Sequence, residues 1–320
     1  MSILQAIILG IVQGLTEFIP ISSTAHLIFA SRAIHLYENE VMRAQQTTAT
    51  IAVIQLGTLL AVLIYFAGDI WAISRAFVVD HLALLRGGRS EAAAETARAT
   101  GRPVRLSREA WLGWLVIIGS VPIGVVGLIF KKQIEGTFTK NLWVIATMMV
   151  VVALLLAAAE KAGRRRTEMD GLGLKDALAV GFAQVLSLIP GASRSGSTMM
   201  GGLFAGQTRE TAARFSFLLS IPAITASGLL EMREALEKLP AGSAAPLLVA
   251  TFVSGVVGYA SIWFLLRFLR THSTGVFIAY RLVVGALILA LLAAGTIPAL
   301  DETNAAPHQA AAPATRQRAR

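Results

Sequence analysis

Six apolar segments, each about 20 residues long, limit most strongly what this chain can fold into. An α-helix needs ~20 residues to cross a hydrocarbon core of ~30 Å. Because the bilayer core offers no water to backbone groups, we expect each segment to be a membrane-spanning helix. The segments are Thr47–Phe66, Ala110–Phe130, Leu142–Ala159, Ala212–Leu230, Pro246–Phe268 and Val276–Gly295.

The composition supports a membrane protein and excludes several other classes. Hydrophobic residues make up 55% of the chain and charged residues 15%, whereas a soluble domain carries roughly 25% charged residues. A soluble enzyme, a nucleic-acid-binding protein and a disordered chain are therefore excluded. The net charge of +9 does not alter this, because the basic residues lie in gaps between apolar segments, as in bilayer proteins. Without cysteine, the chain has no disulfide and no thiolate chemistry.

Two further apolar regions, Ile3–Ala33 and Leu174–Ala205, are interrupted by a proline and a polar cluster. Neither half of either region is long enough to cross a bilayer alone. We expect each region to form a re-entrant hairpin, whose break must be buried in protein or line a wet cavity. The predicted fold is an all-α integral membrane protein with six transmembrane helices and two re-entrant helix hairpins.

The two broken regions resemble each other. Gly-x-x-Gln, Ile-Pro and a serine-rich stretch follow in the same order in residues 10–24 and 181–195, and Gly124-Val-Val-Gly127 is echoed by Gly255-Val-Val-Gly258. Chance is one explanation, because Gly, Ser and Val are abundant. The other is an inverted-topology repeat within a single membrane domain, residues 1–300, with repeat one at about 1–159 and repeat two at about 160–300.

Loop charge predicts the orientation of the two halves. With the N-terminus outside, the inner loops hold most of the loop Lys and Arg, including Arg75, Arg86 and the Arg-rich excursion Gly87–Ser107. The positive-inside rule then places both termini outside, and the hairpins enter from opposite sides with their tips near the midplane. We expect the excursion to be a short amphipathic or disordered segment and residues 301–320 to be a disordered tail.

Polar side chains inside apolar segments concentrate at the two breaks. An ionised side chain at the bilayer centre costs ~2.5–3.5 kcal/mol on insertion scales, so these residues are expected to be functional. At the second break, a helix that starts after a glycine turn would aim free N–H groups at an anion, and Arg194 would match phosphate oxygens. A structural arginine that pairs with Glu17 is the alternative. The second cluster consists of Gly191, Ser193, Arg194, Ser195 and Thr198.

The first break carries a different chemistry. If a helix starts near Ser22, then Ser22 and Ser23 share a face with His26, and a hydroxyl beside an imidazole is the minimum arrangement for an activated oxygen nucleophile. The alternative is a buried histidine that is merely hydrogen-bonded. Glu17 could orient His26, act as a base or hold a cation. The cluster consists of Glu17, Ser22, Ser23, Thr24 and His26.

A zinc site is not supported, because Glu17 and His26 are the only close candidate ligands. One carboxylate together with substrate phosphates is how Mg²⁺ or Ca²⁺ is usually held, so we expect Glu17 to bind such a divalent cation. Gln13 lies one helical turn before Glu17 and would share its face. Arg281 follows Tyr280 near the start of the last span and is expected to snorkel to the interface or pair there.

The two clusters resemble the signature segments of a known family. The segments Gln13-Gly-Leu-Thr-Glu-Phe-Ile-Pro-Ile-Ser-Ser-Thr-Ala-His-Leu27 and Pro190-Gly-Ala-Ser-Arg-Ser-Gly-Ser-Thr198 resemble those of the undecaprenyl-diphosphate phosphatase family of the bacitracin-resistance type. Residues 215–222 and Tyr280-Arg-Leu also look like this family. The resemblance covers about residues 1–297.

This resemblance implies a multi-pass enzyme of the bacterial inner membrane that removes the terminal phosphate from undecaprenyl diphosphate, a polyprenyl diphosphate lipid, and so recycles the carrier lipid of cell-wall synthesis. It implies catalytic roles for Glu17, Ser23, His26 and Arg194, with Ser23 or water as the attacking oxygen. The substrate would be bound by Gln13, Ser22, Thr24, Gly191, Ser193, Ser195 and Thr198.

A transporter or flippase of a polyprenyl phosphate lipid is the main alternative, because broken helices and inverted repeats are also typical of transporters. A purely structural membrane subunit fits poorly with so many costly polar residues. The sequence leaves the oligomeric state open, a homodimer included.

Overall fold

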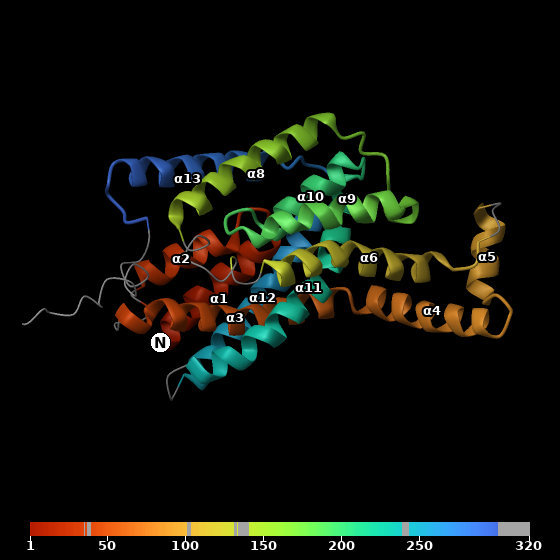
Figure 1. Ribbon diagram of the computed structural model, residues 1–320, viewed down its shortest axis with the longest axis horizontal. Helices are drawn as coiled ribbons and strands as arrows, with labels where there is room; N and C mark the ends of the chain where they lie inside the picture. Colours follow the sequence, from red (N-terminus) through yellow and green to blue (C-terminus); the bar gives the residue numbers. More distant parts are fainter. Residues whose placement is uncertain are drawn as a thin grey trace, which may run out of the picture.

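The computed structural model describes residues 1–34, 36, 40–100, 104–130, 133, 141–238 and 243–299, and the predicted tail lies outside these ranges. Within them the fold is helical and contains no strand, only an isolated bridge between Thr167 and Gln207 (Figure 1). The all-α prediction is confirmed. The helices are α1 (Ile3–Phe18), α2 (Ser23–Ala33), α3 (Glu40–Tyr65), α4 (Ala67–Leu85), α5 (Glu91–Thr100), α6 (Arg108–Ile129), α8 (Leu142–Ala162), η2 (Met169–Gly171), α9 (Leu174–Val185), η3 (Leu186–Leu188), α10 (Arg194–Phe204), α11 (Arg209–Lys238), α12 (Ala244–Leu269) and α13 (Gly275–Ala293).

Each of the six predicted spans coincides with a helix, namely α3, α6, α8, α11, α12 and α13. In the described ranges, α6, α8, α12 and α13 are long and apolar enough to cross a membrane by themselves. The end of α3 and the whole of α4, bent by 70° at Phe66, give a fifth candidate at most. The structure therefore shows a multi-helix membrane protein with four or five candidate spans.

The segment after α3 differs from the sequence prediction. Residues 67–86 were expected in an inner loop, but α4 forms there and packs on α6. The excursion contains a short helix, α5, as the amphipathic alternative predicted. The buried Asp80 carboxylate accepts hydrogen bonds from the Ser90 hydroxyl and, at 2.6 Å, from the Ser107 backbone N–H. Asp80 thus fixes both ends of the excursion, a long-range contact that residue patterns do not reveal.

Both broken regions form two helices joined by a break, α1 with α2 and α9–η3 with α10. Close approach through small residues holds each hairpin in place. A Cβ added at Gly10 of α1 would lie 2.6 Å from the Ala250 carbonyl oxygen of α12, and one at Gly181 of α9 would lie 2.4 Å from the Gly119 oxygen of α6. Each hairpin therefore packs against the second long helix of the opposite half.

Further contacts join helices of the first part of the chain to helices of the second part. The helices α3 and α11 pack on each other, as do α8 and α13. The first predicted span of one part of the chain thus contacts the first of the other, and the third contacts the third. In the two Gly-Val-Val-Gly segments, Gly258 faces the Phe18 ring and Gly127 faces Leu188. Phe18 and Leu188 each stand two residues before a hairpin proline.

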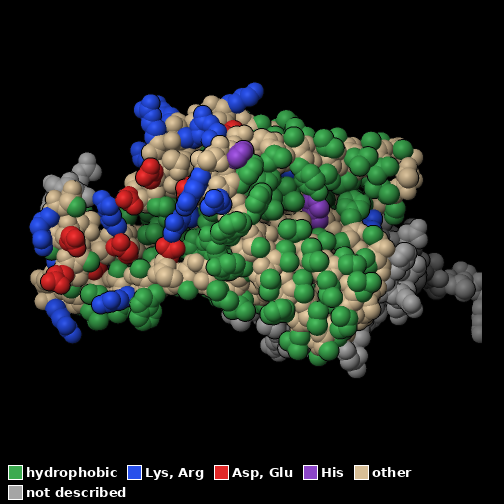
Figure 2. All heavy atoms as spheres, turned by 180° about the vertical axis from the view of Figure 1, so that it is seen from behind, with side chains coloured by type: hydrophobic (Ala, Val, Ile, Leu, Met, Phe, Trp, Pro, Cys, Tyr) green, Lys and Arg blue, Asp and Glu red, His purple; other side chains and the backbone are tan. Residues whose placement is uncertain are grey.

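Charge is distributed unevenly along the long axis of the molecule. On the face that Figure 2 shows, most of the Lys, Arg, Asp and Glu side chains gather at one end, and hydrophobic side chains cover much of the rest. The charged end contains α5, and the N-terminus lies toward the other end (Figure 1). This polarity is that of a protein whose basic loops lie on one side of a bilayer.

Candidate active site

Proline interrupts each hairpin, and a serine in an unusual conformation restarts it. Pro20 and Pro190 have no N–H group, and the following helices begin with Ser22 and Ser193 at their N-caps. Both serines have positive φ, 79° and 70°, which costs roughly 1–3 kcal/mol for a residue other than glycine. Strain at equivalent positions of both breaks indicates that the surrounding structure holds the tips in place for a function.

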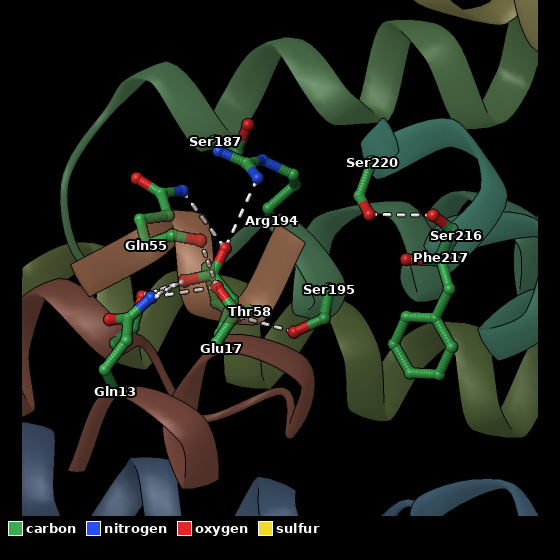
Figure 3. A network of polar contacts seen from close by, with 12 residues as sticks. Gln13, Glu17, Gln55, Thr58, Ser187, Arg194, Ser195, Ser216, Phe217 and Ser220 are labelled. Atoms are coloured by element: carbon green, nitrogen blue, oxygen red, sulfur yellow. Dashed lines mark hydrogen bonds and ion pairs between the residues drawn. The ribbon is translucent and has the colours of Figure 1, made fainter. Parts of the chain in front are cut away.

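The two tips meet at the carboxylate of Glu17. Its Oε2 accepts hydrogen bonds from Gln13 Nε2 at 3.1 Å and from the Ser23 hydroxyl at 3.0 Å, while Oε1 accepts from Gln55 Nε2 and from Arg194, whose NH1 lies 3.3 Å away (Figure 3). Only 7% of the Glu17 side chain is exposed. Four hydrogen-bond donors therefore converge on one carboxylate. The structure thus brings together Gln13, Glu17, Ser23 and Arg194 of the predicted site.

Arg194 is held loosely by comparison. Its guanidinium makes a single long contact with Glu17, and its Nε is buried without a partner in the described part of the chain. Because an arginine offers five N–H donors in a planar fork, most of its donors remain available. Arg194 is therefore suited to donate hydrogen bonds to the oxygens of a phosphate group that approaches it.

The His26 side chain contacts α13, whereas the sequence predicted a contact with Ser22 or Ser23. Its Nδ1 lies 2.7 Å from the Ser22 carbonyl oxygen, and its Nε2 lies 2.6 Å from the Tyr280 hydroxyl of α13, whose ring stacks on the imidazole. Since a carbonyl only accepts, Nδ1 carries the proton and Nε2 accepts from Tyr280. Among the described residues His26 makes no hydrogen bond with Ser23, Glu17 or Arg194, so the expected serine–imidazole pair is not assembled in this conformation.

The other predicted residues lie around these groups. The Ser22 hydroxyl is buried with no partner among the described residues, and Thr24 is exposed. Ser195 donates to the Ile19 carbonyl oxygen at 3.3 Å, which is a second bond between the tips. Gly191 has φ of 92°, and a Cβ there would lie 2.1 Å from the Ile145 oxygen, so only glycine fits this turn. The remaining two serve the start of α10: the Ser193 hydroxyl accepts from the Gly196 N–H, and the Thr198 hydroxyl donates to the Arg194 carbonyl oxygen.

Arg281 corrects one sequence expectation. It does not snorkel to an interface, because it is fully buried, and its guanidinium donates only to backbone carbonyl groups. Those groups are Pro20 of the first tip, Gly191 and Ala192 of the second, and Met148 and Met149 of α8. Proline breaks leave carbonyl groups without helical partners, and Arg281 satisfies them from both tips at once.

A small cavity lies between the tips and α11. Glu17, Arg194, Ser195, Ser216 and Ser220 form its polar lining. Its volume is about 10 Å³, about the room that one water molecule needs. A diphosphate group is larger than this cavity.

Comparison with known proteins assigns the chain to a family. The family described as bacitracin resistance protein BacA matches residues 6–287. The chain belongs to the BacA family. A relative from Syntrophobacter fumaroxidans, named undecaprenyl-diphosphatase, is 49% identical over 90% of this chain and 97% of its own length. Relatives of the same name from Mycolicibacterium vanbaalenii and Nocardia farcinica are 45% and 47% identical, over 94% and 93% of this chain and 100% and 98% of theirs.

The metal-binding capacity of this BacA-family protein is limited. In the described ranges no three His, Asp or Glu side chains come together. Glu17 is the carboxylate of the tip network, and both of its oxygens already accept two hydrogen bonds each. Among the described residues of this site, Glu17 is the carboxylate that would hold a divalent cation.

The sequence did not reveal the contacts of several polar residues on the long helices, although residues 215–222 and Tyr280-Arg-Leu were matched to the family and Arg281 was expected at an interface. Their shared signal was available, because each is a polar residue in a largely apolar segment. Their partners could not be read from the chain, because every one is a contact between distant helices. These residues are Gln55 and Thr58 on α3, Ser216 and Ser220 on α11, and Tyr280 and Arg281 on α13.

Proposed function

We propose that this protein is a membrane phosphatase that hydrolyses undecaprenyl diphosphate to undecaprenyl phosphate and inorganic phosphate, and so returns the carrier lipid to cell-wall synthesis. The observation that carries the proposal is the Glu17–Arg194 contact between the two tips, with Ser23 on the same carboxylate. It combines a phosphate-binding guanidinium and a candidate nucleophile on a helical membrane fold. The relatives named undecaprenyl-diphosphatase support the same activity.

We further propose the complete membrane arrangement. The six spans are α3, α6, α8, α11, α12 and α13, and the α1–α2 and α9–α10 hairpins are re-entrant, one from each side of the bacterial inner membrane. The two halves, at about residues 1–159 and 160–300, form an inverted repeat. Support comes from the pairing of each hairpin with the second long helix of the opposite half.

The reaction begins with the exchange of Arg194 between two anions. The guanidinium leaves Glu17 and binds oxygens of the terminal phosphate, where it neutralises charge that builds up in the transition state. The N–H groups at the start of α10 face the same anion. Because Arg194 is released from an existing ion pair, the clamp is oriented before the substrate arrives.

Phosphoryl transfer then follows one of two routes. In the first, the Ser23 oxygen bonds to the terminal phosphorus, the bridging P–O bond breaks, and undecaprenyl phosphate leaves. Glu17 is placed to accept the Ser23 proton, because the Ser23 hydroxyl already donates to it. Water afterwards cleaves the phosphoserine and releases phosphate. In the second route, water attacks the phosphorus directly and Ser23 only orients it.

His26 and a divalent cation complete the scheme. We assign proton shuttling to His26, through the Nε2 that Tyr280 now occupies. Glu17, once released by Arg194, would hold Mg²⁺ or Ca²⁺ together with the diphosphate. A bound cation supplies charge neutralisation on the phosphate oxygens.

One reconstitution experiment separates this function from lipid transport. The inverted repeat and broken helices also suit a flippase, so phosphate release and lipid scrambling are measured on the same proteoliposomes. The phosphatase proposal expects release of one phosphate per undecaprenyl diphosphate consumed. Scrambling of polyprenyl phosphate without phosphate release would refute it and favour the transporter.

A further inference from the structure

Helix α11 forms one wall of the cavity between the tips and has no role in the mechanism above. Ser216, Ser220 and Ile224 line this cavity, and their spacing of four residues places them on one face of the helix. Figure 3 shows the two serines on the side of the network where Arg194 and Ser195 lie. Along the helix this face changes from hydroxyl groups to hydrocarbon.

The hydroxyl groups of Ser216 and Ser220 donate hydrogen bonds to different kinds of acceptor. The Thr198 hydroxyl lies 2.7 Å from the Arg194 carbonyl oxygen, and a carbonyl can only accept. The single Thr198 proton is therefore used there, so Ser216 must be the donor in its contact with Thr198. Ser216 supports the first turn of α10 and has no proton left for a ligand.

The Ser220 hydroxyl can turn from its present acceptor to another one at little cost. Its hydroxyl donates to the Phe217 carbonyl oxygen at 2.7 Å, an oxygen that already has a helical N–H partner inside α11. If the hydroxyl turns into the cavity, that carbonyl keeps its backbone hydrogen bond. Ser220 is 5% exposed and lines the same cavity as Arg194.

The opposite part of the cavity lining is apolar. Phe18 and Phe217 meet edge to face with their centroids 5.3 Å apart, and both line the cavity with Ile224. Consecutive residues of α1 thus separate the two chemistries, with Glu17 on the polar side and Phe18 on the apolar side. A ligand that matches this lining has an anionic head group joined directly to hydrocarbon.

We propose that Ser220 donates a hydrogen bond to the diphosphate of the substrate, while Phe217 and Ile224 contact the first isoprene unit. The inference rests on the proposed function and deepens it. It orients the lipid: the phosphates lie between Ser220 and Arg194, and the chain leaves along α11 toward Ile224. The cavity widens to admit the head group when Arg194 turns from Glu17 to the phosphate.

The first test compares Ser220→Ala with Ser261→Ala in the full-length protein. Ser261 is a matched control, because it is 3% exposed and donates to a carbonyl of its own helix, Val257, away from the cavity. Loss of one hydrogen bond to a charged group predicts a fall of about 10- to 100-fold in kcat/KM for Ser220→Ala. Ser261→Ala should keep the activity of the unmodified protein.

Equal kcat/KM for the two variants would overturn the inference, while phosphate release by the unmodified protein would leave the proposed function intact. If the unmodified protein released no phosphate, the proposed function itself would fail. Ser220→Cys, which preserves volume but donates weakly, replaces Ser220→Ala if the latter does not fold, with the same expected loss.

The second test follows the prenyl chain without measuring activity. A prenyl diphosphate carrying a photoreactive diazirine on its first isoprene unit is cross-linked to the protein, and the labelled peptide is identified by mass spectrometry. Labelling of α11 near Phe217 and Ile224 is expected. Labelling confined to α13 would contradict the proposed orientation.

Discussion

Arg194 and Glu17 stand 177 positions apart and contact each other at 3.3 Å, each contributed by a different broken helix pair. The contact joins a cation that can bind phosphate to the carboxylate that also accepts from Ser23. Without substrate, the ion pair with Glu17 takes the place of an interaction between Arg194 and phosphate. Both charges then stay paired among apolar helices, where an unpaired charge is costly.

Substitution of Glu17 by glutamine should abolish most activity. Glu17→Gln removes the charge that pairs with Arg194 and the base that we propose for the Ser23 proton, so we expect kcat to fall about 100-fold or more, as general-base losses do. Phosphate release in detergent is the measurement. Glu210→Gln is the control, because it removes a partly exposed pair with Arg270 and should leave activity unchanged. Full activity of Glu17→Gln would remove this carboxylate from the mechanism.

The identity of the attacking oxygen can be determined by trapping. If Ser23 is the nucleophile, rapid acid quenching with substrate labelled in the terminal phosphate should leave label on Ser23, and Ser23→Ala should be almost inactive. Ser31→Ala is the control on the same helix, since Ser31 donates only to the Ile28 carbonyl. Full turnover by Ser23→Ala would favour direct attack by water.

Tyr280→Phe tests the partner of His26. The substitution removes the hydroxyl that lies 2.6 Å from Nε2 but keeps the stacked ring. We expect a moderate fall in kcat, about 10-fold, against a loss of about 100-fold or more for His26→Ala, because general acid–base groups contribute more than the residues that position them. Tyr259→Phe, on exposed Tyr259, is the control. Native rates for His26→Ala would exclude proton shuttling by this residue.

Arg281→Lys tests whether backbone carbonyls of the two tips depend on one guanidinium. A lysine offers a point charge instead of a planar fork, so Pro20, Gly191 and Ala192 cannot all keep their donors. The expected loss is several kcal/mol of stability, at about 1–3 kcal/mol for each unsatisfied buried group. Thermal unfolding in detergent measures it, with exposed Arg267→Lys as control. An unchanged unfolding temperature would mean that the two tips are stable without the Arg281 guanidinium.

Local patterns predicted the helices and the breaks, and they missed how the tips are held. Segment length located six long helices but not α4, and Pro20 and Pro190 located the breaks, because spans and proline act through short stretches of chain. The Arg281 side chain was wrongly expected at an interface. The carbonyl groups that surround it come from three segments far away in the sequence, which a local pattern does not reveal. The same limit explains why His26 was matched with a neighbouring serine although its Nε2 partner, Tyr280, lies 254 positions away.

The decisive measurement is phosphate release by Arg194→Gln in proteoliposomes. Both the variant and the unmodified protein are supplied with undecaprenyl diphosphate, and folding is verified by thermal unfolding. The account predicts steady release by the unmodified protein and a rate lower by about 100-fold or more for the variant, since the guanidinium stabilises transferring phosphate. A folded Arg194→Gln protein that releases phosphate at the unmodified rate would contradict it.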